Sequence, residues 1–235
     1  LNTGNPTYYV NEAINIIASL QTADGGFTYW PGGGYSNDWA TVYATHFLHE
    51  ARKAGYVVSD ALLKPALDAV ARIARSRKTQ DYYVYENQRV AVRRIADKSV
   101  IYALYVLASA GVPEKAIMDF FRSEQYLLAT DTRYLLAGAF ALSGDRPAYG
   151  GLLPPQFETE EAARTSGGSF DSPIRANAII LNVLLETDLN SPNIPRYMEY
   201  LSRHYQSHEW WSTQDDAFVL LAFGKAARMA SGTKV

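Results

Sequence analysis

A glycine-rich reversal between two amphipathic segments constrains the fold of this chain more than any other feature. The reversal reads Gln-Thr-Ala-Asp-Gly-Gly-Phe-Thr-Tyr-Trp-Pro-Gly-Gly-Gly from Gln21 to Gly34. Its glycines tolerate positive φ, and we expect Phe27 and Trp30 to hold the turn against apolar surface. An apolar stripe at helical spacing follows, and Ser36, Asn37 or Asp38 can cap it. Because this order of turn and stripe recurs to the C-terminus, the sequence predicts a series of helical hairpins.

The apolar periodicity predicts ten helices. Their ranges are 8–22, 37–54, 60–78, 97–111, 113–127, 131–143, 156–164, 173–187, 193–206 and 213–230. Cap and N1 signals support several starts, namely Ser59-Asp60, Pro113, Asp131-Thr132, Ser172-Pro173 and Ser212-Thr213. The residues 82–85 and 89–92 suit a short hairpin, and 148–172 is expected to be a long irregular connection.

Two kinds of helix alternate along the chain. One kind is apolar nearly all round and starts near Asp97, Asp131, Ser172 and Thr213, at intervals of 34, 41 and 41 residues. The other kind carries charge on one face, so the pattern predicts buried inner helices and half-exposed outer helices in two concentric layers. Leu181 and Leu220 lie in helices of the first kind and are expected to be nearly fully buried.

Composition excludes several classes of function. The formal net charge of −2 offers no basic excess to neutralise phosphates, so no nucleic acid is expected as a partner. No apolar run approaches the roughly 20 residues that span a bilayer, so no direct membrane insertion is expected. The chain has no cysteine, which rules out disulfides, cysteine-ligated metals and a cysteine nucleophile within it. Its first residues do not resemble a signal peptide, so the chain is expected to be a fragment of a larger protein.

Several motifs at the two ends of the chain occur in a distinctive combination. The N-terminal motifs are Gln21-x-x-Asp-Gly-Gly-Phe-x-x-Trp30-Pro-Gly-Gly, Ser36-x-Asp-Trp39-x-Thr-x-Tyr43 and Phe47-Leu48-x-Glu50-Ala51-x-x-Ala54-Gly55-Tyr56. The C-terminal motifs are Phe170-Asp-Ser-Pro-Ile-Arg175-x-x-Ala178, the run from Leu184 to Asp188, and Trp211-Ser-Thr-Gln214-x-x-Ala217-x-x-Leu220-Leu221-Ala222. Together they resemble the thioester-containing domain of bacterial alpha-2-macroglobulins. The likeness covers most of the chain and is least distinctive at 82–93 and 148–168.

This resemblance implies an all-α fold of the α/α toroid type. In the family, six helical hairpins form a terpenoid cyclase-like toroid, the fold of prenyltransferases and complement thioester domains. We expect residues 1–235 to form one such domain, truncated at the N-terminus because ten helices stand against the family's twelve.

The resemblance also implies a role in a bacterial endopeptidase inhibitor of the periplasm or cell surface. Such proteins trap a protease after it cuts a bait region elsewhere in the parent chain. Neighbouring β-sandwich domains and target proteases are therefore the expected partners. The family's thioester joins the Cys and Gln of a Cys-x-Glu-Gln motif, which cannot form in a chain without cysteine. Either that motif lies upstream of Leu1, or the parent belongs to a branch that lacks it.

Acidic, histidine and arginine side chains, which catalyse reactions or bind ligands in other proteins, have simpler structural interpretations in this chain. Asp215 and Asp216 resemble part of the acidic motif of terpene cyclases, but we expect them to complement a helix N-terminus. His46 and His49, like His204 and His208, have spacings that allow metal ligation, yet we expect surface or rim histidines because no third ligand is evident. Arg89, Arg93 and Arg94 are expected to form ion pairs within the domain or a solvated face. We therefore expect no enzyme activity, no catalytic residue, no cofactor and no metal.

Four aromatic residues are candidates for a domain interface. Trp30, Tyr35, Trp210 and Trp211 lie in turns and can anchor a partner, although packing against a neighbouring hairpin explains them as well. Two other functions stay open at this point. One is a toroid enzyme that acts on an isoprenoid or glycan in its central cavity, and the other is an interaction module of a cell-envelope assembly.

Overall fold

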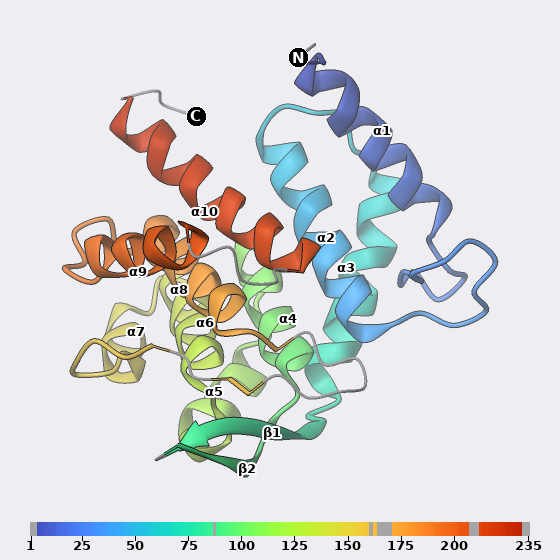
Figure 1. Ribbon diagram of the computed structural model, residues 1–235. Coiled ribbons are helices and arrows are strands. Elements are labelled where there is room, and N and C mark those ends of the chain that lie inside the picture. Colours follow the sequence, from blue (N-terminus) through green and yellow to red (C-terminus); the bar gives the residue numbers. More distant parts are fainter. Residues whose placement is uncertain (1–3, 87, 160–161, 164–170, 207–211, 232–235) are drawn as a thin grey trace. The chain divides into compact units, whose positions relative to one another are not determined.

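The computed structural model describes residues 4–86, 88–159, 162–163, 171–206 and 212–231. These residues are mostly helical and form two compact units, which are described separately. The first unit consists of 1–77 and 98–117, and the second of 78–97 and 118–235. Figure 1 shows the elements along the chain. None of the described helices is long and apolar enough to cross a membrane.

The first unit is a bundle of helices around an aliphatic core. Its elements are α1 (Pro6–Ser19), α2 (Asp38–Lys53), α3 (Asp60–Arg75), α4 (Lys98–Ser109) and the first turn of α5 (Lys115–Ser123). The helices α2, α3 and α4 all contact one another. Asn37 caps α2 by accepting the Ala40 N–H at 3.0 Å, and Ser59 caps α3 by accepting the Leu62 N–H at 3.2 Å. The apolar side chains of α4 are buried along its whole length, as the sequence predicts.

The second unit is built around α8. Its helices are the rest of α5, the short 3₁₀ helix η1 (Gln125–Leu127), α6 (Thr130–Leu142), α7 (Arg146–Leu152), α8 (Pro173–Thr187), α9 (Ile194–Gln206) and α10 (Thr213–Ala230). Contacts with α6, α9 and α10 surround α8 and bury most of its residues. Ser172 caps α8, and Ser212 forms a capping box with Asp215 at the start of α10.

A β-hairpin belongs to the second unit. Strands β1 (Thr79–Glu86) and β2 (Arg89–Ala96) pair antiparallel, with Tyr83 opposite Val92 and Tyr85 opposite Val90. This confirms the hairpin expected from the sequence, although both strands are longer than predicted. The hairpin buries Tyr82, Val84 and Ile95 on one face, against Ala129 and Ala162.

The expected helix at 156–164 is wrong for its described residues. Ala162 forms an isolated antiparallel bridge with Val84, so this part of the chain extends along β1 instead of coiling. Conversely, α7 begins at Arg146 inside a region partly expected to be irregular, and Asp145 caps it by accepting the Ala148 N–H at 3.0 Å. Asp131 and Thr132 do not cap α6, because the helix already begins at Thr130 and Ala129 occupies the cap position.

The burial expected for α10 is also wrong. Leu181 on α8 is fully buried, but Leu220 on α10 is 64% exposed. Only a narrow stripe of α10 is buried, consisting of Asp215, Phe218, Val219, Ala222 and Lys225. This stripe suits a helix that packs against α8 along one side. Apolar composition therefore predicts the burial of α4 and α8 but not that of α10.

Paired truncations test this difference. We expect Leu181→Ala to lower the free energy of unfolding by about 2–5 kcal/mol, because it leaves a cavity in a packed core. The matched change Leu220→Ala removes the same atoms from an exposed position and is expected to alter stability by less than about 0.5 kcal/mol. Urea denaturation of both variants measures the two values, and equal losses would show that Leu220 is a core residue.

Candidate interaction surface

The glycine-rich turn, residues 21–36, is fixed to the helices of the first unit at its base. Gln21 and Phe27 form an antiparallel bridge, and the Gln21 Nε2 donates to the carbonyl oxygens of Gly25 at 3.1 Å and Leu62 at 3.0 Å. Gly25 has a φ of 83°, and a Cβ at this position would lie 2.4 Å from the Pro65 carbonyl oxygen on α3. Only glycine allows the turn to lie this close to the helix backbone.

The Asp24 carboxylate joins the two ends of the turn. It accepts hydrogen bonds from the Thr22 hydroxyl, from the Gly26 N–H at 3.2 Å and from the Ser36 hydroxyl at 2.8 Å. The Thr22 and Ser36 hydrogen bonds are the main reasons why the pKa of Asp24 is lowered, with smaller contributions from Gly26 and the Arg72 charge. Arg72 of α3 also donates to the Asp24 carbonyl oxygen. The Asp24 side chain therefore closes the turn, and the backbone carbonyl of the same residue ties the turn to α3.

Phe27 anchors the middle of the turn in the core. Its ring is buried among the apolar residues of α2 and α3. Its N–H donates to the Thr41 hydroxyl at 2.9 Å, and its carbonyl oxygen accepts the Asn37 N–H at 2.8 Å. The turn is thus tied to the first residues of α2 by backbone and side-chain bonds together.

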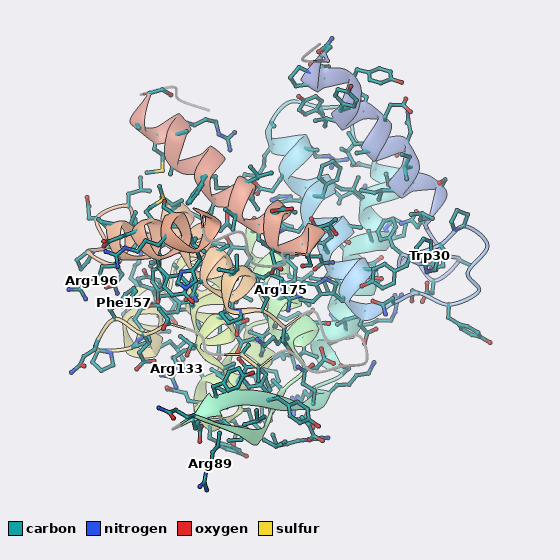
Figure 2. All side chains as sticks on the ribbon, viewed as in Figure 1. Trp30, Arg89, Arg133, Phe157, Arg175 and Arg196 are labelled. Atoms are coloured by element: carbon teal, nitrogen blue, oxygen red, sulfur yellow. The ribbon has the colours of Figure 1, made fainter. Side chains whose placement is uncertain are left out.

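Beyond Phe27 the turn projects into solvent. Trp30, which is labelled in Figure 2, is 77% exposed, and Tyr35 is 92% exposed. The expectation that Trp30 holds the turn against apolar surface is therefore wrong. Phe27 alone fills that role, and the Gly33 N–H bonds to the Trp30 carbonyl at 3.1 Å in a reversal that Gly32 completes with a φ of 79°.

Trp30 and Tyr35 are therefore exposed, and their part in a domain interface stays a prediction. Large aromatic side chains on a fixed backbone supply contact area at low entropic cost. Trp210 and Trp211, the other two predicted interface residues, lie outside the described residues.

The histidines have structural surroundings. His46 is buried, which contradicts the expected surface position, and its Nδ1 lies 2.6 Å from the Tyr102 hydroxyl. His204 places Nδ1 2.8 Å from the Tyr200 carbonyl oxygen and stacks on that ring. His208 lies outside the described residues. Within the described ranges, no group of three possible ligands is placed to hold a metal ion.

The acidic and basic candidates are engaged in local interactions. The Asp215 carboxylate accepts the Ser212 N–H at 2.7 Å, which confirms its helix-capping role, and Asp216 lies in the same first turn. Arg93 pairs with Glu86, and Arg94 pairs with Asp81 at 2.7 Å, as expected for ion pairs within the domain.

Two cavities of the second unit were not anticipated from the sequence. A groove of about 670 Å³ is lined by Pro154, Pro155, Phe157, Asp188, Pro192 and Arg196, among others. The Arg196 guanidinium lies 5.6 Å from the centre of the Phe157 ring (both labelled in Figure 2). Asp188 is the one carboxylate in its lining among the residues that the structure describes, whereas glycoside hydrolysis needs two. Asp188 accepts a hydrogen bond from Tyr149 at 3.3 Å, and burial together with this charge raises the pKa of Tyr149 to about 12.

The second cavity, of about 350 Å³, lies between the hairpin and the start of α6. Its lining includes the charged residues Glu86, Arg93, Arg133 and Glu158 beside apolar residues such as Ile95. Glu86 is engaged by Arg93. Neither cavity can be predicted from the sequence, because residues from distant segments of the chain form both linings.

Replacement of Asp24 tests the turn. We expect Asp24→Asn to lower the free energy of unfolding at pH 7 by about 0.5–1.5 kcal/mol, because an amide oxygen is a weaker acceptor for the same donors. Since the pKa of Asp24 is lowered on folding, its contribution is present above the unfolded-state pKa and is lost as the pH falls through the folded-state value. The difference between wild type and variant should therefore disappear in strong acid. Asp68→Asn on α3 is the matched control, and equal stability of all three proteins at pH 7 would contradict the proposed role.

Comparisons with known proteins place these features in a wider context. No family model matches the sequence. The alpha-2-macroglobulin of Xylella fastidiosa strain Temecula1 is 28% identical over 222 residues, which cover 91% of this chain and 13% of the relative. The alpha-2-macroglobulin of Escherichia coli K12 is 24% identical over 216 residues, with the same two coverages. The chain thus spans about 13% of the length of the relatives that it matches.

Solved structures extend this likeness to the fold. Native alpha-2-macroglobulin of E. coli, from domain MG7 to the C-terminus, matches with a TM-score of 0.74 at 21% identity and covers 93% of this chain and 34% of that one. Salmonella alpha-2-macroglobulin reacted with methylamine matches with a TM-score of 0.69 at 22% identity, over 89% of this chain and 14% of that one. Trypsin-activated E. coli alpha-2-macroglobulin matches with a TM-score of 0.67 at 21% identity, over 89% and 14%. The chain is therefore similar, along nearly all of its length, to one segment of bacterial alpha-2-macroglobulins and shares the fold of that segment.

Proposed function

We propose that this chain is a domain of an alpha-2-macroglobulin-like endopeptidase inhibitor, a protein that traps proteases. The observation that carries the proposal is the similarity to such proteins over 91% of the chain, supported by the shared fold. In this proposal the whole chain is one α/α toroid domain of a longer protein in the bacterial periplasm or at the cell surface. Its partners are neighbouring β-sandwich domains of the parent chain and the target proteases.

The role of this domain is conformational. With no cysteine in the chain, it can form no thioester of its own, so covalent capture would depend on residues outside it. A trap must instead change shape after cleavage, which requires interfaces that break and re-form. A rigid turn with exposed aromatic side chains suits such an interface, because little order has to be gained each time it forms.

The experiment that tests the proposal uses the longer protein. After incubation with trypsin, we expect hydrolysis of a large protein substrate to fall while hydrolysis of a small chromogenic peptide persists, because a caged protease still admits small molecules. Trypsin is a suitable probe because the similar E. coli protein is known in a trypsin-activated form. Unchanged hydrolysis of both substrates would exclude the proposed function.

Substitutions at the tip of the turn test its part in trapping. Trp30→Glu should leave the thermal stability of the protein unchanged, since the indole is mostly exposed, but should weaken inhibition several-fold on the large substrate. Tyr126→Glu, on η1, is the matched control at a similarly exposed aromatic residue. Trp211→Glu applies the same test to the second predicted interface. Full inhibition by a folded Trp30→Glu protein would remove the turn from the mechanism.

Enzyme activity of the isolated chain would favour the alternative of a toroid enzyme. We expect no turnover of glycan or isoprenoid substrates and no incorporation of methylamine, which opens thioesters in this family. Turnover that disappears in the double variant Asp215→Asn with Asp216→Asn would overturn the assignment of these acids to helix capping.

A further inference from the structure

The outer edge of strand β2 is the feature of the second unit that the proposed function does not use. On the other side of the hairpin, the edge of β1 is covered by residues 162–163. The Ala163 N–H donates to the Tyr83 carbonyl oxygen at 2.8 Å, and Ala162 bridges Val84. No third strand lies beside β2 among the described residues.

The direction of the β2 backbone groups follows from this bridge. In an antiparallel pair, opposed residues alternate between those that exchange hydrogen bonds and those whose N–H and C=O groups point outward. The Tyr83 carbonyl points away from β2, so Tyr83 and its partner Val92 form an outward-pointing pair. The same holds two residues along, for Tyr85 and Val90. The N–H and C=O groups of Val90 and Val92 therefore point away from β1, and they form an edge with no backbone hydrogen bond to any other described residue.

The side chains beside this edge are unusually apolar for an exposed strand. Tyr83, Tyr85, Val90 and Val92 share the outer face of the hairpin, and Val90 and Val92 are 53% and 59% exposed. Aromatic and β-branched residues stabilise a strand mainly by packing against neighbours, and an open edge of this kind is a template for a further strand. Charged residues lie at the border of this face, where Arg94 forms an ion pair with Asp81.

The charge of β2 defines the occupant that fits. Residues 89–94 contain three arginines and no acid. Arg93 and Arg94 form ion pairs with Glu86 and Asp81 of β1, so they oppose the pairing of a further strand less than unpaired cations would. Arg89 projects from the end of the hairpin in Figure 2, and it makes no ion pair with the described residues. A strand with acidic side chains would complement this charge.

We propose that β2 accepts an extended strand of alternating apolar and acidic residues, supplied by another domain of the longer polypeptide. The inference rests on the proposed function only because it requires a longer chain. In the Xylella fastidiosa relative, the matched segment is 13% of the whole protein. Backbone hydrogen bonds to Val90 and Val92 would supply the affinity, and contacts with Tyr83, Tyr85 and Arg89 would supply the selectivity.

Amide hydrogen exchange tests this pairing with controls in the same strand. In the isolated chain, the inward-pointing amides of Ala91 and Arg93 should exchange slowly and those of Val90 and Val92 rapidly. In the longer protein, Val90 and Val92 should slow at least tenfold while Ala91 and Arg93 change little. Equal exchange of Val90 and Val92 in both proteins would overturn the proposal. The trapping assay is independent of this readout: a longer protein that protects the edge but inhibits no protease would refute only the proposed function.

A peptide probe tests the chemistry of the occupant. A seven-residue peptide of alternating valine and glutamate should shift the amide resonances of β2 in the isolated chain, and the matched valine–lysine peptide should bind at least tenfold more weakly. Val92→Pro removes an outward N–H without removing a bond to β1, and it should reduce binding of the first peptide at least tenfold. If this variant unfolds, Arg89→Glu replaces it and should reverse the charge preference. Equal binding of both peptides, or none, would overturn the proposal.

Discussion

The hydrogen bonds of the Asp24 carboxylate are the constraint on which the candidate interaction surface depends. They close the turn between Thr22 and Ser36, while the Gln21 side chain bonds its base to α3 and Gly25 lets it lie close to that helix. Because the base is fixed, the tip can expose Trp30 and Tyr35 without losing its conformation. A flexible loop with the same residues would pay the entropy of ordering each time it bound a partner. The turn therefore connects a local sequence motif to an interaction that can form repeatedly.

Burial in this protein is determined by the number of neighbouring elements more than by the composition of a helix. Both α8 and α10 are rich in apolar residues, yet α8 is surrounded and α10 packs mainly on one partner. The buried stripe of α10 even includes Lys225, whose Nζ lies 2.5 Å from Glu186 of α8. Such a pair joins the two helices at a defined register, since either charge left alone in the interface would be costly.

The sequence predicts local structure here better than it predicts surroundings. Caps such as Asn37, Ser59, Ser172 and Ser212 depend on adjacent residues, so they could be read directly. The positions of Trp30, His46 and Leu220 depend on distant segments, and each was misassigned. The helix expected at 156–164 failed for the same reason, because Ala162 pairs with Val84, 78 positions earlier in the chain. The sequence suggests Trp30 and Tyr35 as interface candidates, which stays a prediction, but it gives no indication of the hydrogen bonds that the Asp24 carboxylate accepts.

The turn and the open edge of β2 have one feature in common: each presents exposed aromatic side chains on backbone that is fixed by hydrogen bonds. We interpret both as surfaces that the longer protein covers, at least in one of its states. Hydroxyl-radical labelling of Trp30, Tyr35, Tyr83 and Tyr85 tests this account most directly, in the isolated chain and in the longer protein before and after trypsin treatment. The account predicts strong labelling in the isolated chain, several-fold protection in the untreated longer protein, and a change in protection after cleavage. Equal labelling of these side chains in all three samples would contradict it.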